Sequence, residues 1–440
     1  MLLKKLIKNL PEKKKKLRIK GLSINSKNIS KGFIFFAIRG YKSNGEKFIK
    51  EAVTKGAEVV ICSKKCKYIN NKILVIKTSN IKRLLSEITS SFYKLKPNNI
   101  IAVTGTNGKT SVADLFYQIL NLNNIPVASI GTLGIKLKGK IIKSDLTSPD
   151  IISLHKNLEK IKKKKINNVI IEASSHGLHQ KRINNLNIKA GIFTNFSQDH
   201  LDYHKTFKSY LNAKLSLFKN LLSERKTIIS DKFIKEFSLL KKISRKKNLR
   251  LVDINSIKEK IKMNKKLDFF DFNLTNLSMA IAAARLCNLN EKKIFDCLHK
   301  IKNVNGRLEL VKTFANDVKV FVDFAHTPDA LQKSLTVLKN YYGENITLVF
   351  GCGGERDTKK RPLMAKVASS ICKKIYVTDD NPRGEKPENI RKQILNNIKI
   401  KNRFEIGDRN KAIKTAISQS SPKEIIIVAG KGHEEKQVYK

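Results

Sequence analysis

Short apolar runs recur along the chain, each followed by a Gly-rich or polar turn and then by a helical pattern. This alternation is typical of α/β proteins. Ligands of open α/β sheets lie beyond the carboxyl ends of the strands, so the polar residues after each run are the candidates for chemistry. Strands are predicted at residues 32–38, 57–62, 72–76, 100–103, 169–171, 191–193, 320–322, 346–350, 375–377 and 425–428.

The 440 residues correspond to about three domains at roughly 150 residues each. A break is predicted near Lys96-Pro97-Asn98-Asn99, immediately before the strand at 100–103. The second block runs to about residue 302. The predicted domains are therefore 1–97, 98–302 and 303–440.

The charge balance is unusual, because 89 Lys and Arg face 37 Asp and Glu, for a formal net charge of +52. Such a surplus favours a nucleic-acid or acidic-membrane partner. Only 15 of the basic residues are Arg, however, and Arg is the residue preferred for bidentate phosphate and guanine contacts. The excess of Lys, Ile and Asn is typical of A/T-rich mutational drift, and we favour that origin.

Several protein classes are excluded by the same composition. No apolar run approaches the about 20 residues needed to span a bilayer, and the N-terminus lacks the apolar core of a signal peptide. The six Cys are scattered, and Cys62 and Cys66 have no second Cys or His pair near them, so a zinc site is not expected. Free thiols indicate a reducing cytoplasm.

The strongest local signal lies at residues 101–111, where a strand runs into a Gly turn and then a helix. One helix face is apolar at Val112, Leu115, Phe116, Ile119 and Leu120. Backbone N–H groups and a helix N-terminus hold phosphate oxygens in such loops, while a Lys reaches the terminal phosphates and a Thr ligates Mg²⁺. Val103 stands where the common phosphate loop has its first Gly. The predicted ATP-phosphate residues are Gly105, Thr106, Asn107, Gly108, Lys109, Thr110 and Ser111.

Two later strands end in residues suited to a metal–ATP site. The strand at 169–171 ends in Glu172, and a carboxylate there is a natural Mg²⁺ ligand. The strand at 191–193 leads into a polar segment that contains His200. A lone His after a strand is more often structural, but after a phosphate loop and a strand-end Glu we favour a functional role.

Together, these motifs resemble those of a known family, the Mur ligases, which are ATP-dependent amino-acid ligases of cell-wall precursor synthesis. The resemblance covers nearly the whole chain, with the motifs in the right order. It rests on the segments 104–110, 172–177, 195–204, 306–309 and 323–331.

The resemblance implies an α/β fold of three domains. These are an N-terminal domain for a UDP-linked substrate, a central parallel-sheet domain like those of phosphate-loop ATPases, and a C-terminal Rossmann-like domain. It also implies ATP and two Mg²⁺ ions as cofactors. Further ATP-binding residues carried over from the family are Asn273, Asn276, Arg307, Asp323 and His326.

Lys214 aligns with the lysine that such ligases carbamylate, and it falls on an Ala- and Leu-rich helix after His200. A carbamate formed from CO₂ turns an ammonium into an anion that can ligate a second Mg²⁺. The resemblance therefore implies N6-carboxylysine at this position. The implied catalytic residues are Lys109, Glu172, His200 and Lys214, and the implied metal ligands are Thr110, Glu172, His200 and carbamylated Lys214.

The UDP-linked substrate is expected to lie across the first two domains. Ser148 stands where the family usually has a second Thr, which keeps the hydroxyl, whereas the residues around Ser26 depart from the usual Asp-Ser-Arg. The residues implied for this substrate are Ser26, Thr147, Ser148, Ser174, Gln180 and Arg182.

Within the family the chain resembles the members that add diaminopimelate, because it carries their Asp380-Asn381-Pro382-Arg383 signature. Diaminopimelate has a distal carboxylate, which Arg383 can hold by a planar bidentate pair. The implied amino-acid site is Arg356, Asp380, Asn381, Pro382, Arg383, Gly430 and Glu434. Family members usually continue for some thirty or more residues beyond the Gly430–Glu434 motif, whereas the sequence stops at Lys440, so either the protein itself or this sequence of it is shortened.

The implied activity is ligation of meso-2,6-diaminopimelate to the D-Glu γ-carboxylate of UDP-N-acetylmuramoyl-L-Ala-D-Glu through an acyl phosphate. We expect a monomer in the bacterial cytoplasm that binds no nucleic acid and does not insert into membranes. Three alternatives are the same ligase using L-lysine, a folylpolyglutamate synthetase and, from charge alone, a basic nucleic-acid-binding ATPase. The Asp380–Arg383 signature and the Ser174, Gln180 and Arg182 cluster argue against the second.

Overall fold

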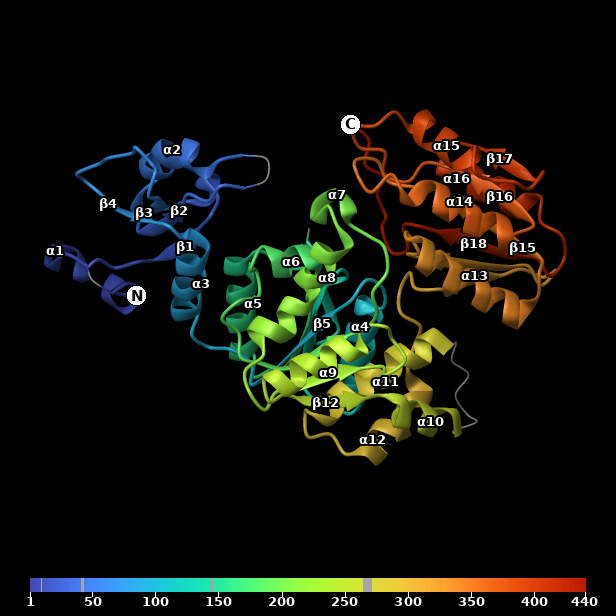
Figure 1. The fold of residues 1–440 in the computed structure, drawn as a ribbon, viewed down its shortest axis with the longest axis horizontal. Helices are drawn as coiled ribbons and strands as arrows, with labels where there is room; N and C mark the ends of the chain where they lie inside the picture. The colour runs from blue at the N-terminus through green and yellow to red at the C-terminus, as the bar shows by residue number, and fades with distance from the viewer. Residues whose placement is uncertain (9, 41–42, 144–145, 264–270) are drawn as a thin grey trace. The chain divides into compact units, whose positions relative to one another are not determined.

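The computed structural model describes residues 1–8, 10–40, 43–143, 146–263 and 271–440, with the side chains of 271 and 272 left out (Figure 1). The chain forms two compact units. The first comprises Met1–Ile100, Pro126–Lys189 and Asn220–Leu222, and the second comprises Ile101–Ile125, Ala190–Lys219 and Ser223–Lys440. Among the described residues, no helix is long and apolar enough to cross a membrane. All six cysteines are free thiols and buried.

The first unit begins with a four-stranded parallel sheet in the order β1-β2-β3-β4. Alternate residues of a strand face opposite sides. Accordingly, Ile34 and Phe36 join one core cluster, while Phe35 joins the other. The elements are β1 Gly21–Ser23, β2 Phe33–Phe36, β3 Ala57–Ser63, β4 Leu74–Thr78, α2 Ile49–Thr54 and α3 Ile81–Phe92, with short turns η1 Leu3–Lys5, α1 Glu12–Lys15, η2 Ser26–Asn28 and η3 Gly45–Phe48.

The predicted strands of this sheet are confirmed, but the fourth lies two residues later than the pattern placed it. Expected at 72–76, β4 covers Leu74–Thr78. The side-chain oxygen of Asn70 accepts hydrogen bonds from the backbone N–H groups of Lys72, at 2.8 Å, and Ile73, at 3.3 Å. This local turn holds both amide groups outside the strand ladder.

The rest of the first unit contains strands in the order β9-β6-β7-β8. β6 and β9 are parallel, and β6, β7 and β8 form an antiparallel meander. The predicted strand before Glu172 is confirmed as β9. The meander was not predicted. The elements are β6 Val127–Gly131, β7 Gly134–Leu137, β8 Lys140–Ile142, β9 Asn168–Glu172, α5 Ile151–Lys163 and α6 Ser175–His179.

Helix α5 buries His155 completely, and this burial has a consequence for stability. Burial first, and the charge of Lys96 second, lower the pKa of His155 to about 4, although the Asn184 carbonyl at 3.1 Å opposes the shift. Since the unfolded chain binds this proton near pH 6.5, the fold loses stability as the pH falls from about 6.5 toward 4. We expect a loss of about 2 kcal/mol by pH 5 from this residue.

Urea unfolding at pH 7 and pH 5 measures this effect. His155→Gln, whose amide can still donate to Asn184, should lose less stability between the two pH values than the wild type. His299→Gln is the matched control, because His299 is exposed. Equal pH dependence in His155→Gln and the wild type would contradict the assignment.

The second unit contains strands in the order β12-β11-β10-β5. β10, β11 and β12 are parallel, and α4 packs against α11. The elements are β5 Asn99–Thr104, β10 Ile188–Phe193, β11 Thr227–Ser230, β12 Arg250–Asp253, α4 Lys109–Leu122, α7 Leu201–His204, α8 Phe207–Ser216, the π-turn Leu217–Leu221, α9 Phe237–Lys246, α10 Asn255–Met263, α11 Asp271–Arg285, α12 Glu291–Asp296 and η5 Leu298–Lys300. Residues 99–100, 188–189 and 220–221 of these elements are counted in the first unit.

A six-stranded sheet in the order β13-β14-β18-β15-β16-β17 completes the second unit (Figure 1). Only β13 is antiparallel to its neighbour. Residues of α13, α14 and α15 join the core on one face, and residues of α16 join the core on the other. The predicted Rossmann-like layering is confirmed. The elements are β13 Glu309–Thr313, β14 Lys319–Asp323, β15 Ile346–Phe350, β16 Lys374–Val377, β17 Arg403–Glu405, β18 Ile425–Ala429, α13 Pro328–Tyr342, α14 Lys360–Ile371, α15 Pro387–Leu395 and α16 Arg409–Ser418.

Candidate active site

The predicted phosphate loop joins β5 to α4, and two of its positions admit only glycine. Gly105 has φ +144° and Gly108 has φ +85°. A Cβ on Gly105 would lie 1.8 Å from the Thr194 hydroxyl oxygen, and one on Gly108 would lie 2.5 Å from Asn276 Oδ1. The loop backbone therefore has the close approach and positive φ that an anion-binding turn requires.

Lys109 is the first residue of α4, and its side chain folds back over the loop. Its Nζ lies 3.0 Å from the Gly105 carbonyl oxygen and 2.7 Å from that of Thr106. The ammonium thus lies beside the N-terminus of a 14-residue helix, where the helix dipole also favours negative charge. This local geometry suits a terminal phosphate, as the sequence predicts.

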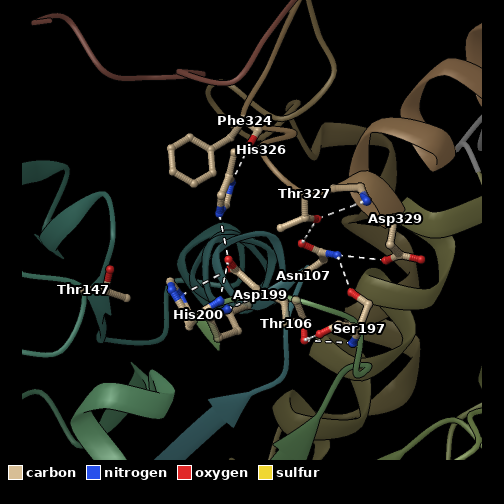
Figure 2. A network of polar contacts seen from close by, with 12 residues as sticks. Thr106, Asn107, Thr147, Ser197, Asp199, His200, Phe324, His326, Thr327 and Asp329 are labelled. Atoms are coloured by element: carbon tan, nitrogen blue, oxygen red, sulfur yellow. Dashed lines mark hydrogen bonds and ion pairs between the residues drawn. The ribbon is translucent and has the colours of Figure 1, made fainter. Parts of the chain in front are cut away.

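The segment after β10 braces the loop through short polar side chains. Asn195 Oδ1 accepts from the Asn107 N–H at 2.9 Å, and the Thr194 hydroxyl donates to the Asn107 carbonyl at 2.6 Å. Ser197 N–H donates to the Thr106 hydroxyl at 3.0 Å (Figure 2). Sequence reasoning recognised this segment as a motif but assigned no role to these three residues. Their signal was their position directly after a strand that neighbours the phosphate loop.

Lys214 lies on α8 and is 1% exposed. Its Nζ donates to the Gly105 carbonyl at 2.6 Å and lies 4.3 Å from the centre of the Tyr210 ring. Burial, and then the positive charge of Lys109, hold the pKa of Lys214 well below the ordinary value, against the opposing charge of Asp199. The structure thus places a buried lysine with a lowered pKa in contact with the backbone of the predicted phosphate loop.

Asp199 lies between two imidazoles that come from separate segments of the second unit (Figure 2). Its Oδ2 is 3.3 Å from His200 Nε2 and 3.6 Å from His326 Nε2. Burial by itself would raise the pKa of Asp199, but the two histidines and the nearby charge of Lys360 hold that pKa well below its ordinary value. The carboxylate therefore stays ionised and orients both rings. Asp199 was not singled out from the sequence.

Two further contacts join the phosphate-loop residues to the segment before β13 and to the start of α13. Asn107 Nδ2 donates to Asp329 Oδ2 at 2.9 Å, and Arg307 Nη2 donates to the Thr110 hydroxyl at 3.0 Å (Figure 2 shows the first). Arg307 also lies 4.2 Å above the Phe324 ring. The predicted ATP residues Arg307 and Thr110 are thereby brought together.

The other predicted ATP residues have different surroundings. Asn276 lies against Gly108, whereas Asn273 lies three residues earlier on the same helix, α11, and is half-buried. Asp323 is buried at the end of β14 and accepts from the Leu308 N–H at 3.2 Å and from the Ser334 hydroxyl. Burial raises the pKa of Asp323. The ATP-binding role of Asp323 stays a prediction.

In the first unit, four of the six predicted substrate residues form one hydrogen-bonded cluster. The Ser148 hydroxyl lies 3.0 Å from that of Ser174, and Arg182 Nη1 donates to the Ser148 carbonyl at 2.7 Å. Arg182 Nη2 also donates to Gln180 Oε1 at 2.7 Å. Ser26 lies in η2 instead, where its hydroxyl donates to Glu51 at 2.7 Å.

Glu172 is 1% exposed at the end of β9, as the strand pattern predicts. Its carboxylate accepts from Thr132, from the N–H at 2.9 Å and from the hydroxyl at 3.0 Å. The Thr132 hydroxyl also lies 3.2 Å from that of Thr147. Thr132, which sequence reasoning missed, therefore connects the predicted metal ligand to a predicted substrate residue.

The predicted amino-acid site surrounds the loop after β16. Arg383 has φ +55°, and its Nη1 donates to the carbonyls of Gly354, at 2.8 Å, and Asn381, at 3.2 Å. Burial first, and then the like charge of the exposed Arg356, lower the pKa of Arg383 despite neighbouring carboxylates. Two guanidinium groups that repel each other would be stabilised by an anionic ligand.

Several residues of the predicted amino-acid site are fixed by contacts with one another. Asn381 and Asp380 are buried, and Asn381 Nδ2 donates to Glu434 Oε2 at 3.0 Å. Gly430 has φ +111°, and a Cβ there would lie 2.8 Å from Asp380 Oδ2. Pro382 is also buried. The residues of the diaminopimelate signature are thus in contact with the Gly430–Glu434 motif, although more than forty positions of sequence separate them.

The described part of the chain holds no group of three His, Cys, Asp or Glu side chains arranged as metal ligands are. The predicted ligands are nevertheless suited to Mg²⁺ in chemical type, since Glu172 supplies a buried carboxylate and Thr110 a hydroxyl. The Mg²⁺ assignment therefore stays a prediction.

A glycine turn at a helix N-terminus, a lysine folded over it and a Rossmann-like sheet define an α/β enzyme with a phosphate-loop site. Comparison with known proteins gives the family. Residues 18–93 match "Mur ligase family, catalytic domain", residues 103–284 match "Mur ligase middle domain" and residues 306–432 match "Mur ligase, glutamate ligase domain".

Individual relatives agree with these matches. The chain is 40% identical, over 96% of its length and 93% of the relative's, to the UDP-N-acetylmuramoyl-L-alanyl-D-glutamate–2,6-diaminopimelate ligase of Rickettsia bellii (strain RML369-C). A solved structure with the same description is 28% identical, has a TM-score of 0.68 and covers 100% of this chain and 95% of that one. The MurF ligase of Thermotoga maritima, in complex with ADP, is 17% identical, with a TM-score of 0.63 and 94% of both chains covered. The chain belongs to the Mur ligase family.

Proposed function

We propose that this enzyme ligates meso-2,6-diaminopimelate to the D-Glu γ-carboxylate of UDP-N-acetylmuramoyl-L-Ala-D-Glu, using ATP, in peptidoglycan precursor synthesis. The observation that carries the amino-acid assignment is the pair Arg383 and Arg356, whose like charges fit a distal carboxylate. The name of the 40% identical relative supports the same reaction. L-lysine ends in an ammonium, which this pair would repel.

We assign the substrates to three domains, 1–97, 98–302 and 303–440. The Ser148, Ser174, Gln180 and Arg182 cluster, with Thr147 and Ser26, would bind the UDP-linked dipeptide. The phosphate loop, with Asn273, Asn276, Arg307, Asp323 and His326, would bind ATP. The diaminopimelate residues would be Arg356, Asp380, Asn381, Pro382, Arg383, Gly430 and Glu434.

The proposed reaction has two steps. The D-Glu γ-carboxylate attacks the γ-phosphorus of ATP, so that a P–O bond to ADP breaks and an acyl phosphate forms. The amine of diaminopimelate then attacks the acyl carbon, inorganic phosphate leaves and the amine loses a proton. Lys109 and the N-terminus of α4 would hold the phosphoryl oxygens in place, which makes catalysis mainly positioning and charge neutralisation.

Two Mg²⁺ ions would neutralise charge on the phosphate oxygens when bound. We assign Thr110, Glu172, His200 and carbamylated Lys214 to hold them. Asp199 would keep the His200 ring oriented through its contact at 3.3 Å, as carboxylates beside metal-binding histidines do.

We assign this enzyme to the cytoplasm, where reduced thiols persist, and we expect a monomer that binds no nucleic acid. Six free, buried cysteines support the first assignment. The arginines at the substrate positions account for only a few of the 89 basic residues, and we attribute most of the +52 charge to the solvated surface.

A phosphate-release assay tests the substrate assignment. With ATP, Mg²⁺ and the UDP-linked dipeptide present, diaminopimelate should stimulate release with a kcat/KM about 100-fold above that of L-lysine. Release with lysine but not with diaminopimelate would contradict it. Release only with a folate and glutamate would favour a folylpolyglutamate synthetase.

Arg383→Met should raise the KM for diaminopimelate by about 100-fold, because a bidentate charge-assisted pair is lost. The KM for ATP should stay within about twofold. Arg250→Met is the matched control, because Arg250 is exposed on β12. An unchanged KM for diaminopimelate in Arg383→Met would remove Arg383 from the site.

A further inference from the structure

Lys431, just after β18, is a buried lysine with no assigned role. It is 6% exposed, and its Nζ lies 3.0 Å from Asn381 Oδ1, 3.0 Å from Glu434 Oε2 and 2.7 Å from the Lys436 carbonyl oxygen. An ammonium has three N–H groups and no acceptor. Each of its donors therefore has one acceptor, and two of the three acceptors are side chains of the proposed amino-acid site.

The acceptors of Lys431 are also joined to one another. Asn381 Nδ2 donates to the same Glu434 oxygen at 3.0 Å, and Asn381 Oδ1 also accepts from the Val438 N–H at 2.9 Å. The segment that contains Val438 runs along the signature loop, where the Arg383 N–H donates to the Val438 carbonyl at 2.9 Å. One ammonium thus lies at the junction of the signature loop, the Glu434 carboxylate and the last segment of the chain.

The charge of Lys431 also acts on Glu434. Burial by itself would raise the pKa of Glu434, but hydrogen bonds from Lys431 and Asn381 and the charge of Lys431 lower it overall. The carboxylate therefore stays ionised at neutral pH, with Oε2 fixed by two donors. The fixed, ionised Glu434 carboxylate suits the ammonium group of an amino acid. Arg383, which lies in the signature loop with Asn381, suits a carboxylate of the same amino acid.

We propose that Lys431 is a positioning residue of the amino-acid site, which fixes Asn381 and Glu434 so that they receive the distal ammonium of a zwitterionic amino acid. The inference rests on the proposed function. Lys431 acts through Glu434 and Asn381, with its own three donors already occupied.

Steady-state kinetics of Lys431→Met test the proposal. The KM for diaminopimelate should rise about 10-fold, whereas the KM values for ATP and the UDP-linked dipeptide should stay within about twofold. Lys436→Met is the matched control, because its exposed side chain is removed while its carbonyl still accepts from Lys431. Lys436→Met should behave as the wild type.

A double variant separates positioning from general stability. If Lys431 acts through Glu434, Lys431→Met combined with Glu434→Gln should have nearly the KM for diaminopimelate of Glu434→Gln alone. Full additivity, an unchanged KM in Lys431→Met, or an equal loss for all three substrates would overturn the proposal.

The same kinetics distinguish this proposal from the proposed function. The proposed function is tested by which amino acid the wild type prefers. The role of Lys431 is tested by the ratio of the KM of Lys431→Met to the KM of the wild type for that amino acid. If the wild type uses L-lysine, the function fails and the Lys431 ratio is measured with L-lysine. A wild type that ligates neither amino acid overturns both.

Discussion

Lys109→Ala should lower kcat by about 1,000-fold, because it removes the cation that lies over the phosphate loop. The lost interaction forms with phosphoryl oxygens whose charge shifts during transfer, so the effect should fall on kcat more than on the KM for diaminopimelate. Rates of phosphate release and of product formation, measured at saturating substrates, check the expectation.

The fold should survive this change. Lys109 is the first residue of α4, where alanine is well tolerated, and its Nζ donates to the loop carbonyls of Gly105 and Thr106. Circular dichroism and Tm should therefore match the wild type. Lys242→Ala, on the exposed face of α9, is the matched control and should keep full activity. Full activity in Lys109→Ala would remove the phosphate-loop assignment.

Lys214→Met should lower kcat by about 100-fold or more while leaving the protein at least as stable as the wild type. CO₂ adds to a neutral amine, forming the N–C bond of the carbamate and releasing a proton. Burial and the charge of Lys109 lower the pKa of Lys214, which favours the neutral amine that this addition needs. Methionine keeps much of the apolar stem but cannot form the carbamate.

Carbon-13 NMR gives a direct reading of this modification. With ¹³C-bicarbonate, the wild type should show one protein-bound carbamate signal that is absent in Lys214→Met. Lys208→Met, on the exposed side of the same helix, should keep both the signal and the activity. A wild type that shows no carbamate signal yet is fully active would overturn the role given to Lys214.

The parts of the site that the sequence predicted are those set by local rules. The strand, the Gly turn and the apolar helix face of residues 101–122 lie next to one another in sequence, so their geometry follows from spacing and φ preferences. Glu172 follows in the same way from the end of a strand, whereas Ser148 was indicated only by the family resemblance.

The parts that the sequence could not predict depend on contacts between distant segments. Asp199 reaches His326, and Asn107 reaches Asp329, across more than a hundred positions, and no local pattern encodes such pairs. Lys214 is the clearest case, because a lysine in so basic a chain is expected at the surface. Only the family resemblance indicated its role, and the structure buries it.

The unpredicted meander β6–β8 shows a different limit. Its first strand, Val-Ala-Ser-Ile-Gly, contains small residues that give a weak strand pattern, and its last strand is fully exposed, with Ile141 and Ile142 at the surface. Neither alternation nor a long apolar run marks these strands, so pattern reasoning has little to detect.

Mass spectrometry of the ligation product tests the central claim most directly. Incubation of the enzyme with ATP, Mg²⁺, UDP-N-acetylmuramoyl-L-Ala-D-Glu and an equal mixture of meso-diaminopimelate and L-lysine should give one nucleotide product. Its mass should equal that of the dipeptide substrate plus diaminopimelate minus water, with one phosphate released per product. A product that carries lysine, or ATP hydrolysis without any ligated product, would contradict the account.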